Sequence, residues 1–161
     1  MNTFLTQTAL FVKGLLSYNE QLIRVGRLDF VDNDFTSDYI AIDAISSSTR
    51  RAGGEIYNGT AESMEYNQQW LTPVVLSFYG TNAFTNATNF SLLLPSQASQ
   101  ELQTTLGIAV FKASNITDIK ILTGQQFNNR LDLTVNVQYG ISTTVATKRI
   151  DTAQTTFLFN T

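Results

Sequence analysis

The sequence predicts an α+β fold in which two or three helices pack on one face of a largely antiparallel, mixed β-sheet. Apolar residues first recur at helical spacing, then follow strand patterns, return to helical spacing in mid-chain and end in strands, an order typical of α+β proteins. The 161 residues are 43% hydrophobic, which suffices for one packed core. We therefore expect a single domain over residues 1–161, with an N-terminal helix or arm over 1–21 and a sheet-and-helix body over 22–161.

The N-terminal half predicts one helix followed by strands. Over residues 3–16 the apolar side chains fall near one helical face, although Gly14 lowers the helix propensity. β-favouring residues predict strands at residues 39–45, 64–70 and 74–79, with Pro73 between the last two. A polar stretch and the turn signal Asn58-Gly59 predict an excursion of the chain over Ser46–Gly59.

Two helices are predicted in the middle of the chain. The first begins near Ala83 and is stopped by Pro95, because proline cannot continue a helix. The second begins after Ser96, whose hydroxyl suits the N-cap, and ends at Gly107, which suits the C-terminal position.

The C-terminal third predicts strands. A short strand follows the second helix at residues 108–111, and strict alternation of apolar and polar residues predicts a half-buried strand at 131–139. We expect residues 140–147 to turn the chain and residues 148–159 to return as the last strand.

Composition removes several classes of chemistry. The chain has no His and no Cys, which excludes an imidazole or thiolate zinc site, a Ser–His–Asp triad and a disulfide. Only 14% of residues are charged and the formal net charge is −3, which argues against wrapping of nucleic acid. No apolar stretch approaches the ~20 residues that a membrane span needs. We expect no enzymatic activity, no cofactor and no membrane partner.

Carboxylates form two candidate sites. Aspartates that could ligate calcium through oxygen stand at Asp29, Asp32, Asp34 and Asp38. Their spacing does not follow the EF-hand loop, so a solvated turn is the favoured interpretation. Glutamates that could supply the acid and base of a glycoside hydrolase stand at Glu55, Glu62 and Glu65. Nothing in the sequence places these three across a cleft, and a structural role is favoured.

Aromatic residues of the predicted strands are candidates for a sugar-stacking platform. They are Tyr57, Tyr66, Trp70 and Tyr79. Aromatic side chains in strands belong more often to the core or to a subunit interface. We expect core positions first, an interface second and a ligand platform third.

An ordered set of segments carries a resemblance to a known family. In residues 73–83 an apolar strand ends in Tyr79-Gly80 and small residues begin a helix. Four shorter stretches add to it, at residues 38–40, 101–108, 127–133 and 149–154. In this order, from about residue 29 to residue 159, the chain resembles the terminator and neck proteins of tailed bacteriophages. The ordered set is more specific than any one piece.

The resemblance implies a structural protein of a virion, assembled in the cytoplasm of the host bacterium. Proteins of this family form a ring, usually a hexamer, around a channel through which the genomic DNA passes without specific binding. The ring caps the tail tube, stops its growth and joins it to connector or head-completion proteins. The implied partners are therefore other copies of the chain, the tail tube protein and the connector. The resemblance transfers no catalytic residue.

We expect the assembly contacts in two stretches of low apolar content, Ser46–Gly59 and Gly140–Thr147, because loops on a rigid sheet often carry function. Candidate residues of a subunit interface or channel are Arg50, Arg51, Glu55, Ile56, Tyr57, Trp70, Ile141, Thr143 and Lys148. Two other functions remain open. One is a different virion component, such as a head-completion or tail-tube protein, and the other is a carbohydrate-binding module that uses Trp70 and Tyr66.

Overall fold

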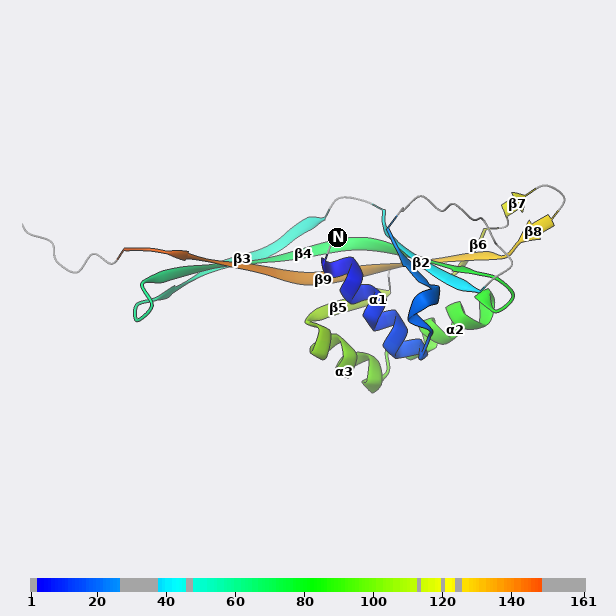
Figure 1. Ribbon diagram of the computed structural model, residues 1–161, viewed down its shortest axis with the longest axis horizontal. Coiled ribbons are helices and arrows are strands. Elements are labelled where there is room, and N and C mark those ends of the chain that lie inside the picture. Colours follow the sequence, from blue (N-terminus) through cyan, green and yellow to red (C-terminus); the bar gives the residue numbers. More distant parts are fainter. Residues whose placement is uncertain are drawn as a thin grey trace, which may run out of the picture.

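A computed structural model describes residues 3–26, 38–45, 48–112, 114–119, 121–123 and 126–148 of the chain. It confirms the predicted α+β class, with helices on one side of a mixed, mostly antiparallel sheet (Figure 1). The elements in order are α1 (Thr3–Leu16), a 3-10 helix (Glu20–Leu22), β1 (Ile23–Val25), β2 (Tyr39–Ala44), β3 (Thr49–Asn58), β4 (Ser63–Tyr79), α2 (Ala83–Leu93), α3 (Gln97–Leu106), β5 (Ile108–Lys112), β6 (Thr117–Asp118), β7 (Ile121–Thr123), β8 (Gln126–Asn128) and β9 (Arg130–Ala146).

The main sheet is organised around two long central strands. Its order is β1-β2-β4-β9-β5, with β3 also paired to β4 and β6 also paired to β9. The pairing of β1 with β2 is parallel, and the other described pairings are antiparallel. β7 and β8 form a separate two-stranded sheet. β4 and β9 are each 17 residues long and pair along their whole length.

Pro73 lies inside β4, so the prediction of two strands separated by this proline is wrong. On the side of β4 away from β9, β2 pairs with Val74–Tyr79 and β3 pairs with Ser63–Leu71. Pro73 stands between these two partners, and its carbonyl accepts a hydrogen bond from the backbone N–H of Ile45. Proline is tolerated in a strand where no partner needs its missing N–H. The gap between β2 and β3 provides that position.

The two stretches predicted as loops are also strands. Most of Ser46–Gly59 forms β3, and Gly140–Ala146 continues β9 rather than turning the chain. The turn signal Asn58-Gly59 is confirmed at the β3–β4 hairpin, where the side chain of Asn58 accepts hydrogen bonds from the backbone N–H groups of Thr60 and Ala61. The predicted last strand at 148–159 lies almost wholly outside the described residues, and Lys148 itself is not in a strand.

The core lies between the helices and one half of the sheet. Phe11 and Val12 of α1 and Phe90 of α2 are fully buried against Leu76 and Phe78 of β4. The ring of Phe90 lies 6.1 Å from that of Phe11 and 6.2 Å from that of Phe78, between centroids. The predicted helix at residues 3–16 is confirmed as α1, and it contributes to the same core as the sheet.

Local signals determine both ends of α3. The hydroxyl of Ser96 accepts a hydrogen bond from the backbone N–H of Ser99, and Gly107 ends the helix with a φ of 66°. Both confirm the predicted caps. Gln103 then joins the helix to the sheet, because its amide oxygen accepts from the backbone N–H of Val110 on β5 at 2.8 Å. That N–H lies on the outer side of β5, so the side chain covers this part of the sheet edge.

The turn from β4 into α2 requires glycine. Gly80 has a φ of 96°, and a Cβ there would lie 2.7 Å from Cα and 2.9 Å from the backbone N of Asp38. The Asp38 carboxylate accepts hydrogen bonds from the backbone N–H and the side-chain amide of Asn82. Tyr79-Gly80 therefore lets two backbone segments meet where the chain enters α2.

Candidate functional site

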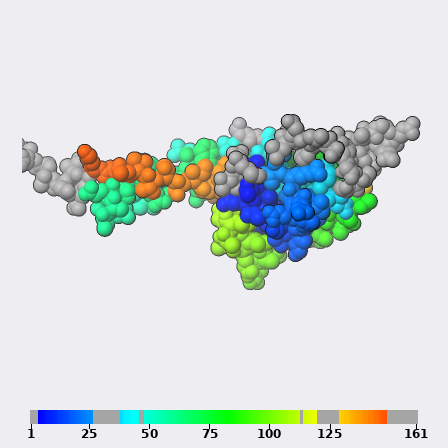
Figure 2. All heavy atoms as spheres, viewed as in Figure 1, coloured from blue at the N-terminus to red at the C-terminus, as the bar shows by residue number. Residues whose placement is uncertain are grey.

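A narrow three-stranded ribbon projects from the body of the molecule. We use the word ribbon for Thr49–Leu71, which comprises β3, the hairpin and the first half of β4, together with Gln138–Ala146 of β9. Figures 1 and 2 show it extending well beyond the helices, which cover only the other half of the sheet. All ten residues of β3 are exposed. Most of the ribbon is exposed, and no described helix covers it (Figure 1).

The root of the ribbon is fixed to the body by Tyr139. Its ring stacks on Phe4 of α1, with the centroids 4.5 Å apart and the planes within 3° of parallel. Its hydroxyl lies 3.1 Å from that of Ser48, which also bonds to the hydroxyl of the buried Thr72. Trp70 pairs with Tyr139 across β4 and β9 and is half-buried there. These contacts hold the ribbon where it leaves the core.

One face of the ribbon carries exposed apolar side chains. Side chains alternate between the two faces of a strand. Every second residue of β4 and β9, counted outward from the buried positions, therefore continues the core face into the ribbon beyond the helices. This face includes Tyr57 (44% exposed), Tyr66 (40%), Ile141 (55%) and Val145 (49%). Exposed apolar side chains grouped on one surface indicate an interaction site more than scattered ones do.

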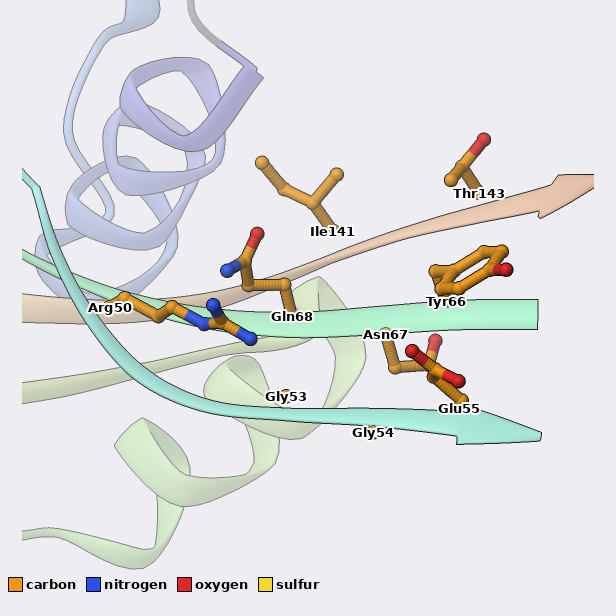
Figure 3. Close-up of a pocket in the computed structure, with 9 residues that line it drawn as sticks. All are labelled: Arg50, Gly53, Gly54, Glu55, Tyr66, Asn67, Gln68, Ile141 and Thr143. Carbon is orange, nitrogen blue, oxygen red and sulfur yellow. The ribbon is translucent and has the colours of Figure 1, made fainter.

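A shallow hollow of about 570 Å³ lies on the same face (Figure 3). Its lining includes Arg50 and Glu55 of β3, Tyr66 of β4 and Ile141 of β9. The guanidinium of Arg50 lies over Gly53, where a Cβ would be only 2.7 Å from its Nη2. The missing side chain at Gly53 makes room for the arginine. The hollow thus offers a cation, an anion and apolar surface within one open depression.

The structure brings some of the predicted interface residues together and separates others. Four of them line the hollow: Arg50, Glu55, Ile141 and Thr143. Tyr57 lies on the same face nearer the hairpin, whereas Ile56 points to the opposite face. Trp70 is at the root, and Lys148 follows the end of β9.

A register shift in β3 decides which face each residue takes. The shift lies between Arg50 and Ala52, so Arg51 is the extra residue of the strand. The predicted set missed Val145 and Gln68, which share the apolar face. The signal for them was the period-two pattern that continues outward along both long strands.

The carboxylate sites predicted from the sequence are not assembled among the described residues. Glu55 is in register with Tyr66, whereas Glu65 is in register with Ile56, which places the two carboxylates on opposite faces of the ribbon. Glu62 lies at the hairpin with a φ of 46°. Asp29, Asp32 and Asp34 lie outside the described residues, and within the described part no group of three or more potential metal ligands occurs.

Tyr79, the fourth aromatic candidate, is part of the body. It is 9% exposed and stacks on Tyr39, with the ring centroids 4.3 Å apart. Burial raises the pKa of Tyr39 to about 12, with a smaller contribution from Tyr79. A core position is therefore correct for Tyr79, whereas Tyr57 and Tyr66 are exposed.

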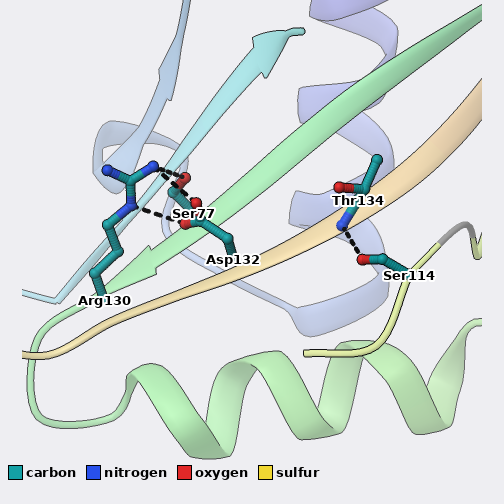
Figure 4. Close-up of polar contacts among 5 residues, drawn as sticks. All are labelled: Ser77, Ser114, Arg130, Asp132 and Thr134. Carbon is teal, nitrogen blue, oxygen red and sulfur yellow. Dashed lines mark hydrogen bonds and ion pairs between the residues drawn. The ribbon is translucent and has the colours of Figure 1, made fainter. Parts of the chain in front are cut away.

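Arg130 at the start of β9 holds this end of the sheet together (Figure 4). Its guanidinium donates two hydrogen bonds of 2.8 Å to the two carboxylate oxygens of Asp132 and a longer one to Ser77. The hydrogen bond to Asp132 raises the pKa of Arg130. Nearby, the hydroxyl of Ser114 accepts from the backbone N–H of Thr134 at 2.9 Å. In each of the two contacts the polar groups satisfy one another, which indicates a structural role.

Comparison with known proteins decides the family. The sequence profile of the family described as phage neck terminator protein matches residues 8–161. The chain belongs to the phage neck terminator family. A search of curated proteins finds no match. As a phage neck protein the chain is a structural component of the virion and contacts other tail or head proteins. Among the described residues of this neck terminator, no helix is long and apolar enough to cross a membrane.

Proposed function

We propose that this chain forms a homo-oligomeric ring, most simply a hexamer, at the junction between the phage tail tube and the head-side connector. The ring caps the tube, ends its growth and joins it to the connector or head-completion proteins. The genomic DNA passes through the central channel without specific binding. The proposed role is structural rather than enzymatic, and assembly takes place in the host cytoplasm. The observation that carries the proposal is the family match over residues 8–161.

The shape of the chain supports this role. A compact body with an exposed ribbon gives one element for the fold and another for contacts with neighbours (Figure 2). The exposed apolar side chains of the ribbon, such as Ile141 and Val145, are costly on an isolated monomer in water, since each leaves apolar area unburied. An oligomer or a virion partner covers such surface.

The charges of the ribbon support passage of DNA without gripping. Its three glutamates, Glu55, Glu62 and Glu65, balance Arg50, Arg51 and the adjacent Lys148. A surface that binds phosphates tightly presents an excess of Lys and Arg, because each neutralised phosphate releases counterions. A balanced ribbon has no such excess.

The test is to locate the protein in the particle and to remove it. Cryo-electron microscopy of intact virions should show a ring of this fold between tail tube and connector. Phage grown without the gene product should yield filled heads unattached to tails and tails of irregular length. A protein absent from virions, or a deletion that leaves joined particles with normal tails, would refute the proposal. Density at the head vertex or along the tube would instead indicate a head-completion or tail-tube protein.

A further inference from the structure

Both long edges of the ribbon are free of described partner strands. β3 pairs with β4 on one side, and no described strand pairs on its other side. The outer side of β9 pairs with β6 and β5 only as far as Tyr139, so its continuation over Gly140–Ala146 is open in the described structure. A strand edge presents unpaired N–H and C=O groups that can add a further strand.

The backbone groups exposed on the β9 edge can be identified. Thr147 donates its N–H to the carbonyl of Glu62, toward β4, whereas the carbonyl of Thr134 accepts from Ser114, away from β4. In an antiparallel pair, successive residues direct their backbone groups alternately to the two sides. The backbone N–H and C=O groups of even-numbered residues of β9 therefore point away from β4. Ser142, Thr144 and Ala146 present these groups at the free edge.

The same alternation identifies the free groups of β3. The backbone N–H and C=O groups of odd-numbered residues of β4 point toward β2 and β3, as the hydrogen bond from the Ile45 N–H to the Pro73 carbonyl shows. Their partners in β3 after the register shift are even-numbered. Gly53, Glu55 and Tyr57 consequently direct their N–H and C=O groups outward. The ribbon thus has two edges of similar length with matching sets of donors and acceptors.

The β9 edge lacks the features that prevent strands from pairing. No charged residue and no proline occurs from Leu133 to Thr147, and the exposed stretch is rich in the β-favouring residues Ile, Thr and Val. Monomeric proteins usually blunt such an edge with charges, proline or a covering side chain. On the body this chain does cover an edge, since Gln103 accepts from Val110 of β5. In the described structure the β9 edge of the ribbon has no such cover, in contrast to the β5 edge of the body.

Strand direction determines which assembly the two edges can make. β3 and β9 both run antiparallel to β4, so they run parallel to each other on opposite edges of the ribbon. Copies related by rotation about an axis along the strands place β9 of one copy beside β3 of the next, in parallel. That contact is head-to-tail and closes into a ring, whereas an antiparallel β9–β9 or β3–β3 contact makes only a two-fold dimer.

We propose that the β9 edge at Ser142–Ala146 pairs in parallel with the β3 edge at Gly53–Tyr57 of a neighbouring copy, so that the ribbons form one continuous sheet around the ring. This inference rests on the proposed function for its partner, a second copy in the assembled neck. It names the contact that builds the ring. Each added copy covers one β9 edge and one β3 edge, and closure leaves neither exposed.

Cysteine pairs test the contact directly, because the natural chain has no Cys. Glu55 and Thr143 lie on one face but on either side of β4, about 10 Å apart for strands spaced by about 4.8 Å. That separation is too wide for a disulfide within one copy. E55C should be combined in turn with I141C, T143C and V145C, which sample the unknown register. At least one pair should give a ladder of covalent oligomers ending at the ring size after mild oxidation of assembled particles.

The single-cysteine variants are the matched controls. Each should remain monomeric on a denaturing gel, because a head-to-tail contact never places a residue beside the same residue of a neighbouring copy. Efficient dimers from a single cysteine would overturn the proposal in favour of a two-fold contact. Absence of a ladder from all three pairs, in particles whose map shows the ring, would also overturn it while leaving the proposed function intact. Absence of the protein from particles would refute the proposed function instead.

A proline variant gives a second test on the full-length protein. T144P removes an outward N–H and breaks no hydrogen bond to β4, and proline is compatible with the open side of an edge strand. It should leave the circular dichroism spectrum unchanged and weaken self-association at least tenfold. T144A keeps the N–H and should assemble within twofold of the natural chain. Normal assembly of a folded T144P would overturn the proposal, and if T144P fails to fold, the cysteine ladder decides.

Discussion

Replacement of Gly80 by alanine tests the account of the turn between β4 and α2. At a φ of 96°, an alanine is strained by about 1–3 kcal/mol. The added Cβ would also lie 2.7 Å from Cα and 2.9 Å from N of Asp38. These are backbone atoms that cannot rotate away, so overpacking costs roughly another 1–3 kcal/mol. We expect the free energy of unfolding to fall by about 4 kcal/mol.

Gly107 provides the matched control. It also has a positive φ, 66°, but no atom lies within 4 Å of the position that a Cβ would take. Gly107→Ala should therefore cost only the conformational term, about 1–2 kcal/mol. Urea unfolding followed by circular dichroism gives both values, and thermal melts should shift by roughly 2–4 °C per kcal/mol at this chain length. Equal losses of stability in the two variants would refute the steric argument at Gly80.

Three further predictions concern the core, the sheet edge and the pH dependence. Phe90→Ala should lower the unfolding free energy by about 3–5 kcal/mol in urea titrations, because this fully buried ring contacts two other aromatic rings; a loss below about 1 kcal/mol would contradict its central position. Gln103→Leu should cost about 1–3 kcal/mol, since it leaves the N–H of Val110 without its acceptor, and faster amide exchange at Val110 should accompany it. The pKa of Tyr39 is raised to about 12 in the folded chain, against an ordinary value of 10.0. Its contribution to the free energy of unfolding is fully present below pH 10 and is lost as the pH rises toward 12, because the unfolded chain deprotonates first. Tyr39→Phe should flatten the stability profile in that range, and an unchanged profile would count against the burial of this hydroxyl.

The elements that the sequence predicts well are those with local causes. Ser96 and Gly107 mark the ends of α3 because a cap depends on a few adjacent residues. The strand at 131–139 is predictable because its alternation reports one buried face. The ribbon carries this signal only in part, because apolar residues alternate at Met64, Tyr66 and Trp70 of β4 whereas β3 has no such pattern. All of β3 is exposed, and it forms a strand because it pairs with β4 across the hairpin. The outer part of β9 is also exposed, and it pairs with the same strand from far away in the sequence.

The candidate site shows the same division. Arg50, Glu55, Ile141 and Thr143 were identified from composition and from their place between predicted elements, and they do line one hollow. Their common face depends on the register shift after Arg50. Without that shift Glu55 would be in register with Glu65 and lie on the opposite face. A single extra residue in a strand is invisible to a pattern of hydrophobicity, so the faces could not be assigned from the sequence.

The continuity of β4 and β9 from the body into the ribbon has a mechanical consequence. Each strand passes through both parts without a break, and 17 residues in extended conformation span roughly 55 Å. A pull on the far end of the ribbon is therefore carried by the covalent backbone of these two strands, whose other ends lie in the core. Neither strand is interrupted between the ribbon and the body, so a displacement of the hairpin acts directly on the strands that form the core.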